Sequence, residues 1–120
     1  MSNRANELVE LVLQGQILEA FETYYHDDVV MQENGSAPTV GKDANRTREE
    51  QFVGFVKELH QNQATKVIVD GEHSAIHWEL EFTGADDKRY RYNQIAVQKW
   101  SDGKVVHEQF FYNPGEGQVA

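Results

Sequence analysis

The last third of the chain constrains the fold most, because it holds three long extended segments separated by tight turns. In the first, residues 74–84, the apolar side chains fall on alternate positions. Ile76, Trp78, Leu80 and Phe82 share one face, and polar side chains occupy the other. Alternation with a period of two predicts a strand with one buried face.

Two more strands follow, over residues 89–100 and 104–112, both rich in β-branched and aromatic side chains. The Asp102-Gly103 pair between them suits a tight hairpin, because both residue types tolerate a positive φ. Residues 84–88 form the earlier turn. Strands joined so closely must be antiparallel neighbours.

The N-terminal half predicts helices over residues 6–14 and 17–25, then a short strand over 29–33. A third helix is expected from about residue 43 to about residue 60, and a strand over 63–70. The apolar stripe of the third helix is Ala44, Thr47, Phe52, Phe55, Val56 and Leu59. Five of its charged residues, Arg46, Glu49, Glu50, Lys57 and Glu58, are assigned to a solvated face.

Helices followed by a run of antiparallel strands predict an α+β fold, in which the helices pack on one face of the sheet. Long strands in a small sheet must twist and bend, so a cavity is expected between the sheet and the long helix. The 120 residues suit one domain over residues 1–120, with an ordered core of about 5–113.

The net charge of -9 argues against nucleic acid and anionic membranes as partners. No apolar run approaches the roughly eighteen residues of a membrane helix, and no signal-like segment follows Met1, so we expect a cytoplasmic protein. The chain has no cysteine, which excludes disulfides and thiolate chemistry.

Several short stretches resemble one family when they are taken in order. They are Tyr-Tyr-His-Asp-Asp-Val-Val at 24–30, Gly-Lys-Asp-Ala at 41–44, Trp78 and Asp-Gly-Lys-Val-Val at 102–106. Together they resemble the SnoaL-like branch of the NTF2-like superfamily, which includes steroid delta-isomerases, polyketide cyclases, limonene epoxide hydrolase, scytalone dehydratase and non-enzymatic binding modules. The resemblance implies a cone (a cystatin-like roll), with three N-terminal helices packed on a strongly curved, mainly antiparallel sheet.

The resemblance also implies which positions carry the chemistry. Glu33 falls where steroid isomerases have their carboxylate base. Leu8 and Ala96 fall where those enzymes have a tyrosine and an aspartic acid as donors. The positions of an arginine, an aromatic residue and an aspartate in related cyclases hold Gln109, Phe111 and Asn113.

Glu33 is therefore the leading candidate for an acid or base, because burial at a pocket wall would raise its pKa. The alternative is that Glu33 ends an edge strand and points to water. Glu108 is a weaker candidate, which faces the pocket if Phe110 and Tyr112 do. In the other register, shifted by one residue, His107, Gln109 and Phe111 face inward instead.

The residues expected to contact a ligand are mostly apolar or aromatic, with Gln94 as an amide hydrogen-bond donor and acceptor. They are Tyr25, Met31, Phe52, Phe55, Leu59, Trp78, Leu80, Tyr92, Gln94, Phe110 and Tyr112. His77, Glu79 and Glu81 alternate as in a metal-binding strand, but a solvated outer face has the same pattern. We expect no metal and no cofactor.

The sequence thus predicts a protein that binds a small hydrophobic or aromatic ligand in its cone, with isomerase-, cyclase- or dehydratase-type chemistry through Glu33. The alternative is a non-catalytic ligand-binding or dimerisation module. In either case a homodimer is expected through the outer sheet face, where Ile95 and Val97 lie among polar residues.

Overall fold

The computed structural model describes residues 2–113 and 118–119. The helices are α1 (Ser2–Leu13), α2 (Ile17–Tyr24) and α3 (Lys42–Phe55). The strands are β1 (Tyr25–Glu33), β2 (Thr39–Val40), β3 (Val56–Asp70), β4 (His73–Gly84), β5 (Arg89–Ser101), β6 (Lys104–Phe111) and β7 (Gln118–Val119). None of these described helices has the length and apolar character needed to cross a membrane.

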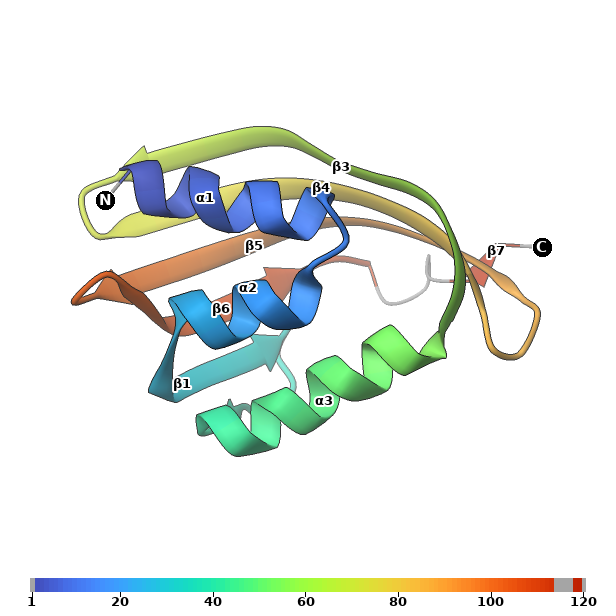
Figure 1. Ribbon diagram of the computed structural model, residues 1–120, viewed down its shortest axis with the longest axis horizontal. Coiled ribbons are helices and arrows are strands. Elements are labelled where there is room, and N and C mark those ends of the chain that lie inside the picture. The colour runs from blue at the N-terminus through green and yellow to red at the C-terminus, as the bar shows by residue number, and fades with distance from the viewer. Residues whose placement is uncertain (1, 114–117, 120) are drawn as a thin grey trace.

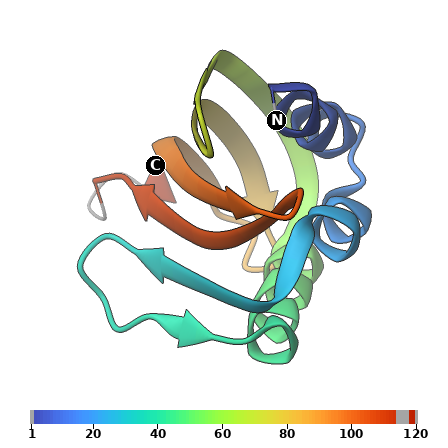
Figure 2. The same cartoon turned by 90° about the vertical axis from the view of Figure 1, so that its left-hand side faces the viewer.

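The strands form one curved sheet in the order β2-β1-β6-β5-β4-β3, with β7 paired to β5. Only β1 and β6 run parallel among the described pairs; the other neighbours are antiparallel. All three helices lie on the concave side of the sheet (Figures 1 and 2). The α+β cone expected from the sequence is therefore confirmed.

The C-terminal meander also follows the sequence pattern. β4 pairs antiparallel with β5, and β5 with β6. Asp102 and Gly103 join β5 to β6 with φ values of 55° and 76°. Two consecutive positive φ values are the geometry of a type I′ turn, whose twist matches that of the strands it connects.

The third helix is shorter than expected, and the prediction that it reaches about residue 60 is wrong. It ends at Phe55, and Val56 already has an extended backbone. Leu59 pairs with Phe82, and Val56 pairs with Gly84, because β3 continues along β4 to its end. The spacing of Val56 and Leu59 fits a helix or a strand equally well. Their pairing with the long strand β4 therefore decides the structure of this segment.

The core fills the space between the helices and the concave face. One cluster joins α1, α2, β1, β5 and β6, and includes Phe21, Tyr25, Val29 and Trp100. A second cluster packs Val9 of α1 against the middle of β4 and β5. These clusters close one end of the cone, and α3 covers the other end without burying any apolar side chain completely.

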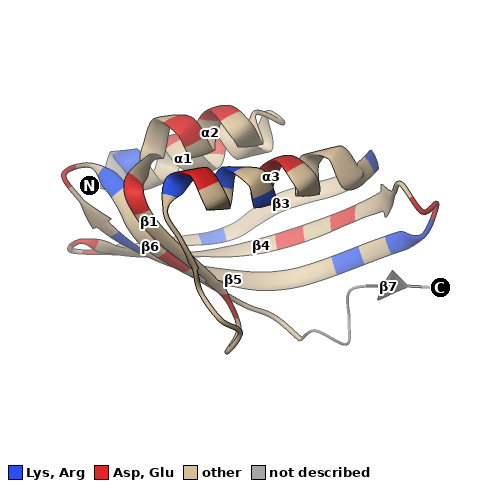
Figure 3. Cartoon of the chain, turned by 90° about the horizontal axis from the view of Figure 1, so that it is seen from below, with Lys and Arg blue, Asp and Glu red and all other residues tan. Residues whose placement is uncertain are grey.

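The convex face of the sheet carries charged side chains toward one end. Glu81 of β4 pairs with Arg89 and Arg91 of β5. Figure 3 shows these acidic and basic positions side by side on the two strands. Cross-strand pairs of opposite charge stabilise this face of the sheet.

Candidate functional site

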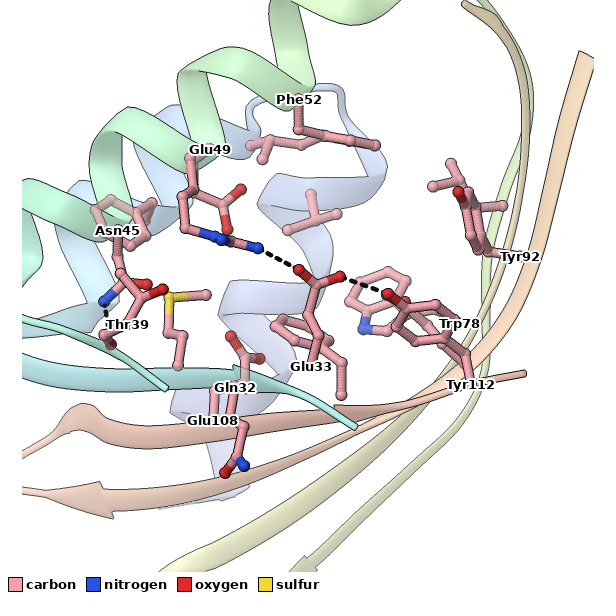
Figure 4. A pocket seen from close by; sticks show the side chains of 18 of the residues that line it. Gln32, Glu33, Thr39, Asn45, Glu49, Phe52, Trp78, Tyr92, Glu108 and Tyr112 are labelled. Carbon is pink, nitrogen blue, oxygen red and sulfur yellow. Dashed lines mark hydrogen bonds and ion pairs between the residues drawn. The ribbon is translucent and has the colours of Figure 1, made fainter. Parts of the chain in front are cut away.

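A cavity of about 640 Å³ lies between α3 and the concave face of the sheet (Figure 4). Nearly all the side chains expected to contact a ligand line it. They are Tyr25, Met31, Phe52, Phe55, Trp78, Leu80, Tyr92, Gln94, Phe110 and Tyr112. The placement of Leu59 is wrong: it is 48% exposed on β3, because α3 ends before it.

Glu108 faces this cavity, so β6 adopts the register in which Phe110 and Tyr112 also face inward. Glu108 is only 2% exposed. Its carboxyl accepts hydrogen bonds from the Tyr25 hydroxyl at 2.5 Å and from Gln98 Nε2 at 2.6 Å. Burial raises the pKa of Glu108 to about 7, although both donors act in the opposite direction.

A chain of buried polar groups fixes the orientation of Gln98. The indole of Trp100 donates to Ser74 Oγ at 2.9 Å, and Ser74 donates to Gln98 Oε1 at 2.6 Å. The amide nitrogen of Gln98 is thereby turned toward Glu108. Each donor in this chain has an acceptor, which is what a buried polar network needs to be stable.

Glu33 lies at the rim of the cavity, where its side chain is 41% exposed. One carboxyl oxygen accepts a hydrogen bond from the Tyr112 hydroxyl at 2.7 Å. The other is paired with the guanidinium of Arg48 from α3. Both interactions are drawn in Figure 4. Glu33 therefore points neither into a dry pocket nor freely into water, but is held at the entrance.

Glu49 is the functional candidate that the sequence missed. It was assigned to the solvated face of the helix, whereas the structure places it half-buried with its carboxyl in the cavity (Figure 4). Burial raises its pKa to about 7, helped by the negative charges of Glu108 and Glu33 and opposed by Arg48. Since Asn45 and Phe52 lie four residues before and three after it, helical spacing from Phe52 could have revealed the shared face.

The opposite side of the cavity is an aromatic wall on the sheet, formed by Trp78, Tyr92 and Tyr112. The rings of Tyr92 and Tyr112 meet edge to face with centroids 5.6 Å apart. Leu8 and Ala96, at the positions of the isomerase donors, are buried apolar residues here. The polar groups beneath the cavity are instead those of Tyr25, Gln98 and Glu108.

Within the described residues, no three histidine, aspartate or glutamate side chains gather closely enough to hold a metal ion. His77, on the outer face, is hydrogen-bonded to Thr65 Oγ1 at 2.7 Å and to Asn93. The arrangement inside the cone is thus one of carboxyl groups and aromatic rings, which suits an apolar molecule with a polar or charged group.

Comparison with protein families gives a match to the SnoaL-like domain over residues 2–112. The chain belongs to the SnoaL-like domain family. No curated protein sequence matches it.

Solved structures share the fold of this SnoaL-like protein at low sequence identity. A candidate SnoaL-like polyketide cyclase, also labelled a carbohydrate phosphatase, from Mesorhizobium loti is 24% identical with a TM-score of 0.82, covering 92% of this chain and 97% of its own. An LEH-like epoxide hydrolase from M. tuberculosis is 16% identical with a TM-score of 0.76, covering 95% and 86%. A protein of ketosteroid isomerase-like fold from Catenulispora acidiphila, in complex with trimethylamine, is 13% identical with a TM-score of 0.73, covering 88% and 82%.

Proposed function

We propose that this SnoaL-like protein binds a small, mainly apolar molecule in its cone and transfers a proton on it, in a reaction of the isomerase, cyclase or dehydratase kind. The supporting observation is the meeting of three carboxyl groups, from Glu33, Glu49 and Glu108, in one cavity with an aromatic wall. Two of them, Glu49 and Glu108, have pKa values raised to about 7. A general acid or base works best when its pKa is close to the working pH.

The three carboxyl groups differ in their freedom to act. Both oxygens of Glu108 accept hydrogen bonds within the core, and Glu33 is held by Arg48 and Tyr112. For Glu49, no hydrogen bond to the carboxyl is found among the described residues, and the group lies in the cavity. We therefore assign the proton transfer to Glu49, keep Glu33 as the alternative acid or base, and give Glu108 the role of raising the pKa of Glu49.

A reaction that needs no knowledge of the natural substrate tests this proposal. In the elimination of nitrobenzisoxazole, a base removes the proton on carbon, the N–O bond breaks, and a coloured cyanonitrophenolate forms. A partly desolvated carboxylate in an apolar cavity accelerates it. We expect measurable turnover that rises with pH through about 7, and a loss of roughly 100-fold in kcat/KM in Glu49→Gln.

Glu50→Gln is the matched control, because Glu50 is exposed on the next position of the same helix. It should retain the activity of the unaltered protein. Glu33→Gln separates the two acid/base candidates: a large loss there assigns the step to the rim, and a small loss leaves it with Glu49. If neither substitution lowers the rate below that of Glu50→Gln, the proton-transfer proposal is wrong.

A second candidate function is a non-catalytic dimerisation module, favoured by apolar side chains on the convex face of the sheet. Ile95 and Phe111 are paired neighbours there and are each 45% exposed. Val97 pairs with Ala75 of β4, and Ala75 pairs in turn with Ile68 of β3. The proposed dimer would bury these exposed apolar side chains, which supports an interface on this face.

The dimer is tested by the mass in solution at micromolar concentration. Light scattering should give a dimer, and Ile95→Glu should convert it to a monomer. Leu13→Glu, which charges an exposed apolar residue of α1, should leave the dimer intact. A monomeric unaltered protein would rule out this interface.

A further inference from the structure

The charges inside the cavity are unbalanced. Three glutamates line it, and Arg48 is the single cationic side chain among the described residues that do so. Arg48 forms an ion pair with Glu33 at the rim, and more than half of the Arg48 side chain is exposed. The interior therefore holds Glu49 and Glu108 with no positive charge between them.

The two interior carboxyl groups interact across the cavity. Glu49 extends from α3 toward the floor, and Glu108 rises from β6 below it (Figure 4). The negative charge of Glu108 is the largest influence of any neighbouring side chain on the pKa of Glu49. Two like charges that face each other in a partly dry space repel, and a cation placed between them would relieve that repulsion.

The aromatic wall offers the second half of such a site. The aromatic residues Trp78, Tyr92 and Tyr112 line the same cavity. Aromatic faces attract alkylated ammonium groups through their quadrupoles, and they pack equally well against an apolar body. An anionic ligand would meet a net negative cavity, and a neutral one would leave the carboxyl groups uncompensated.

We propose that the ligand of this cavity carries an alkylated ammonium group, which binds between Glu49 and Glu108 while its apolar body lies along the aromatic wall. This inference rests on the proposed function, since it names the ligand class of the same cavity. It adds that recognition depends on charge and not on apolar burial alone.

The test compares choline with the neutral alcohol in which a tert-butyl group replaces the trimethylammonium group. The two molecules have nearly the same shape, so their difference in affinity reports the charge. NMR titration of the backbone amides, at constant ionic strength, should shift residues of α3, β1 and β6. We expect choline to bind at least about tenfold more tightly than the alcohol.

Two variants locate the charge effect. Glu49→Gln should reduce the preference for choline to near unity, and Glu50→Gln should leave it unchanged. Equal binding of choline and the alcohol would overturn the cationic ligand but leave a ligand-binding cone. Failure of choline to bind the cavity would also overturn it, while the nitrobenzisoxazole assay would still report proton transfer independently.

The pH dependence provides a further readout. The charged or titratable groups that act on Glu49 are Glu108, Glu33 and Arg48, and Tyr25 adjoins Glu108. A cation favours the ionised carboxyl groups, so binding should release protons near neutral pH. Choline affinity should rise about tenfold between roughly pH 6 and pH 8, and the rise should be smaller in Glu49→Gln. A flat profile would contradict the proposal.

Discussion

At the scale of single residues, the most consequential interaction is the one between Glu108 and Tyr25. Glu108 is a carboxyl group in a nearly dry position, and such a group is unstable there unless hydrogen bonds compensate for its lost water. Glu108 accepts two hydrogen bonds, and Tyr25 donates the shorter one, at 2.5 Å. Burial and the adjacent carboxyl raise the pKa of Tyr25 well above its usual value, so it remains a donor at any physiological pH.

Removing this hydroxyl should destabilise the protein in a pH-dependent way. In Tyr25→Phe, the ionised form of Glu108 loses a donor, so we expect the free energy of unfolding to fall by about 1–3 kcal/mol at roughly pH 8. The loss should be smaller at roughly pH 5, where Glu108 is protonated in the folded state. Urea unfolding followed by tryptophan fluorescence measures both values.

Tyr24→Phe is the control for this prediction. The Tyr24 hydroxyl donates to Glu7 at 2.9 Å in a partly buried position, where water can replace it. The decrease in the free energy of unfolding in Tyr24→Phe should be small and similar at both pH values. An equal loss at both pH values in Tyr25→Phe would contradict the assigned role of the hydroxyl.

At the scale of elements, the junction between α3 and β3 shapes the cavity. The Phe55 ring packs edge to face on Phe82 and Tyr90, at 6.3 and 5.6 Å between centroids. The Phe55 carbonyl accepts a hydrogen bond from the amide of Ala85 at 2.7 Å. The turn after β4 thereby anchors the C-terminal end of α3 above the sheet.

Glycine substitutions test this anchor. A Cβ at Gly84 would collide with the Phe55 ring, which Phe82 and Tyr90 hold in place. Gly84→Ala should therefore lower the free energy of unfolding by about 1–3 kcal/mol. Gly54→Ala should raise it by up to about 1 kcal/mol, because Gly54 is an exposed helical residue with nothing within 4 Å of a new Cβ. Chemical denaturation compares them, and a stable Gly84→Ala would contradict the close packing.

The same junction shows how far the sequence could predict the structure. The alternation of apolar side chains was sufficient to predict β4, and the Asp102-Gly103 pair was sufficient to predict the turn between β5 and β6. Both signals are local and strong. The end of α3 was not predictable from spacing, because Val56 and Leu59 suit a helical stripe and a strand alike. Only pairing with β4, more than twenty residues later in the chain, selects the strand.

The candidate site was predictable where its residues are apolar and not where they are charged. A glutamate that faces a cavity has the same hydropathy as one that faces water, so Glu49 looked like part of a solvated face. Arg48 was missed for the same reason. Glu108 was a candidate only because of its spacing from Phe110 and Tyr112. The sequence left two registers of the last strand open, and the pairing of β6 with β5 in the structure decides between them.

At the scale of the whole molecule, the carboxyl groups in the cavity lower the stability of the folded state when they are ionised. The protein carries a net charge of -9, and two of its carboxyl groups lie where ionisation is unfavourable. Other carboxyl groups act differently: Arg46 lowers the pKa of Glu22, and Arg89 and Arg91 lower that of Glu81. Those groups affect stability only in the acidic range, below their ordinary pKa values.

Stability should therefore fall as the pH rises from about 5 to about 8. The pKa values of Glu49 and Glu108 are raised from 4.5 to about 7 on folding, so the folded state binds more protons than the unfolded state within this window. The stabilisation is complete below about pH 4.5 and is lost as the pH rises through about 7, by roughly 1–3 kcal/mol. Glu49→Gln should make the profile less steep between these limits, with the contribution of Glu108 remaining, and Glu50→Gln should leave it unchanged, as measured by urea unfolding at each pH. A stability that increases steadily toward pH 8 would mean that these carboxyl groups are better hydrated than their burial in the cavity allows, and the acid/base role of Glu49 would lose its physical basis.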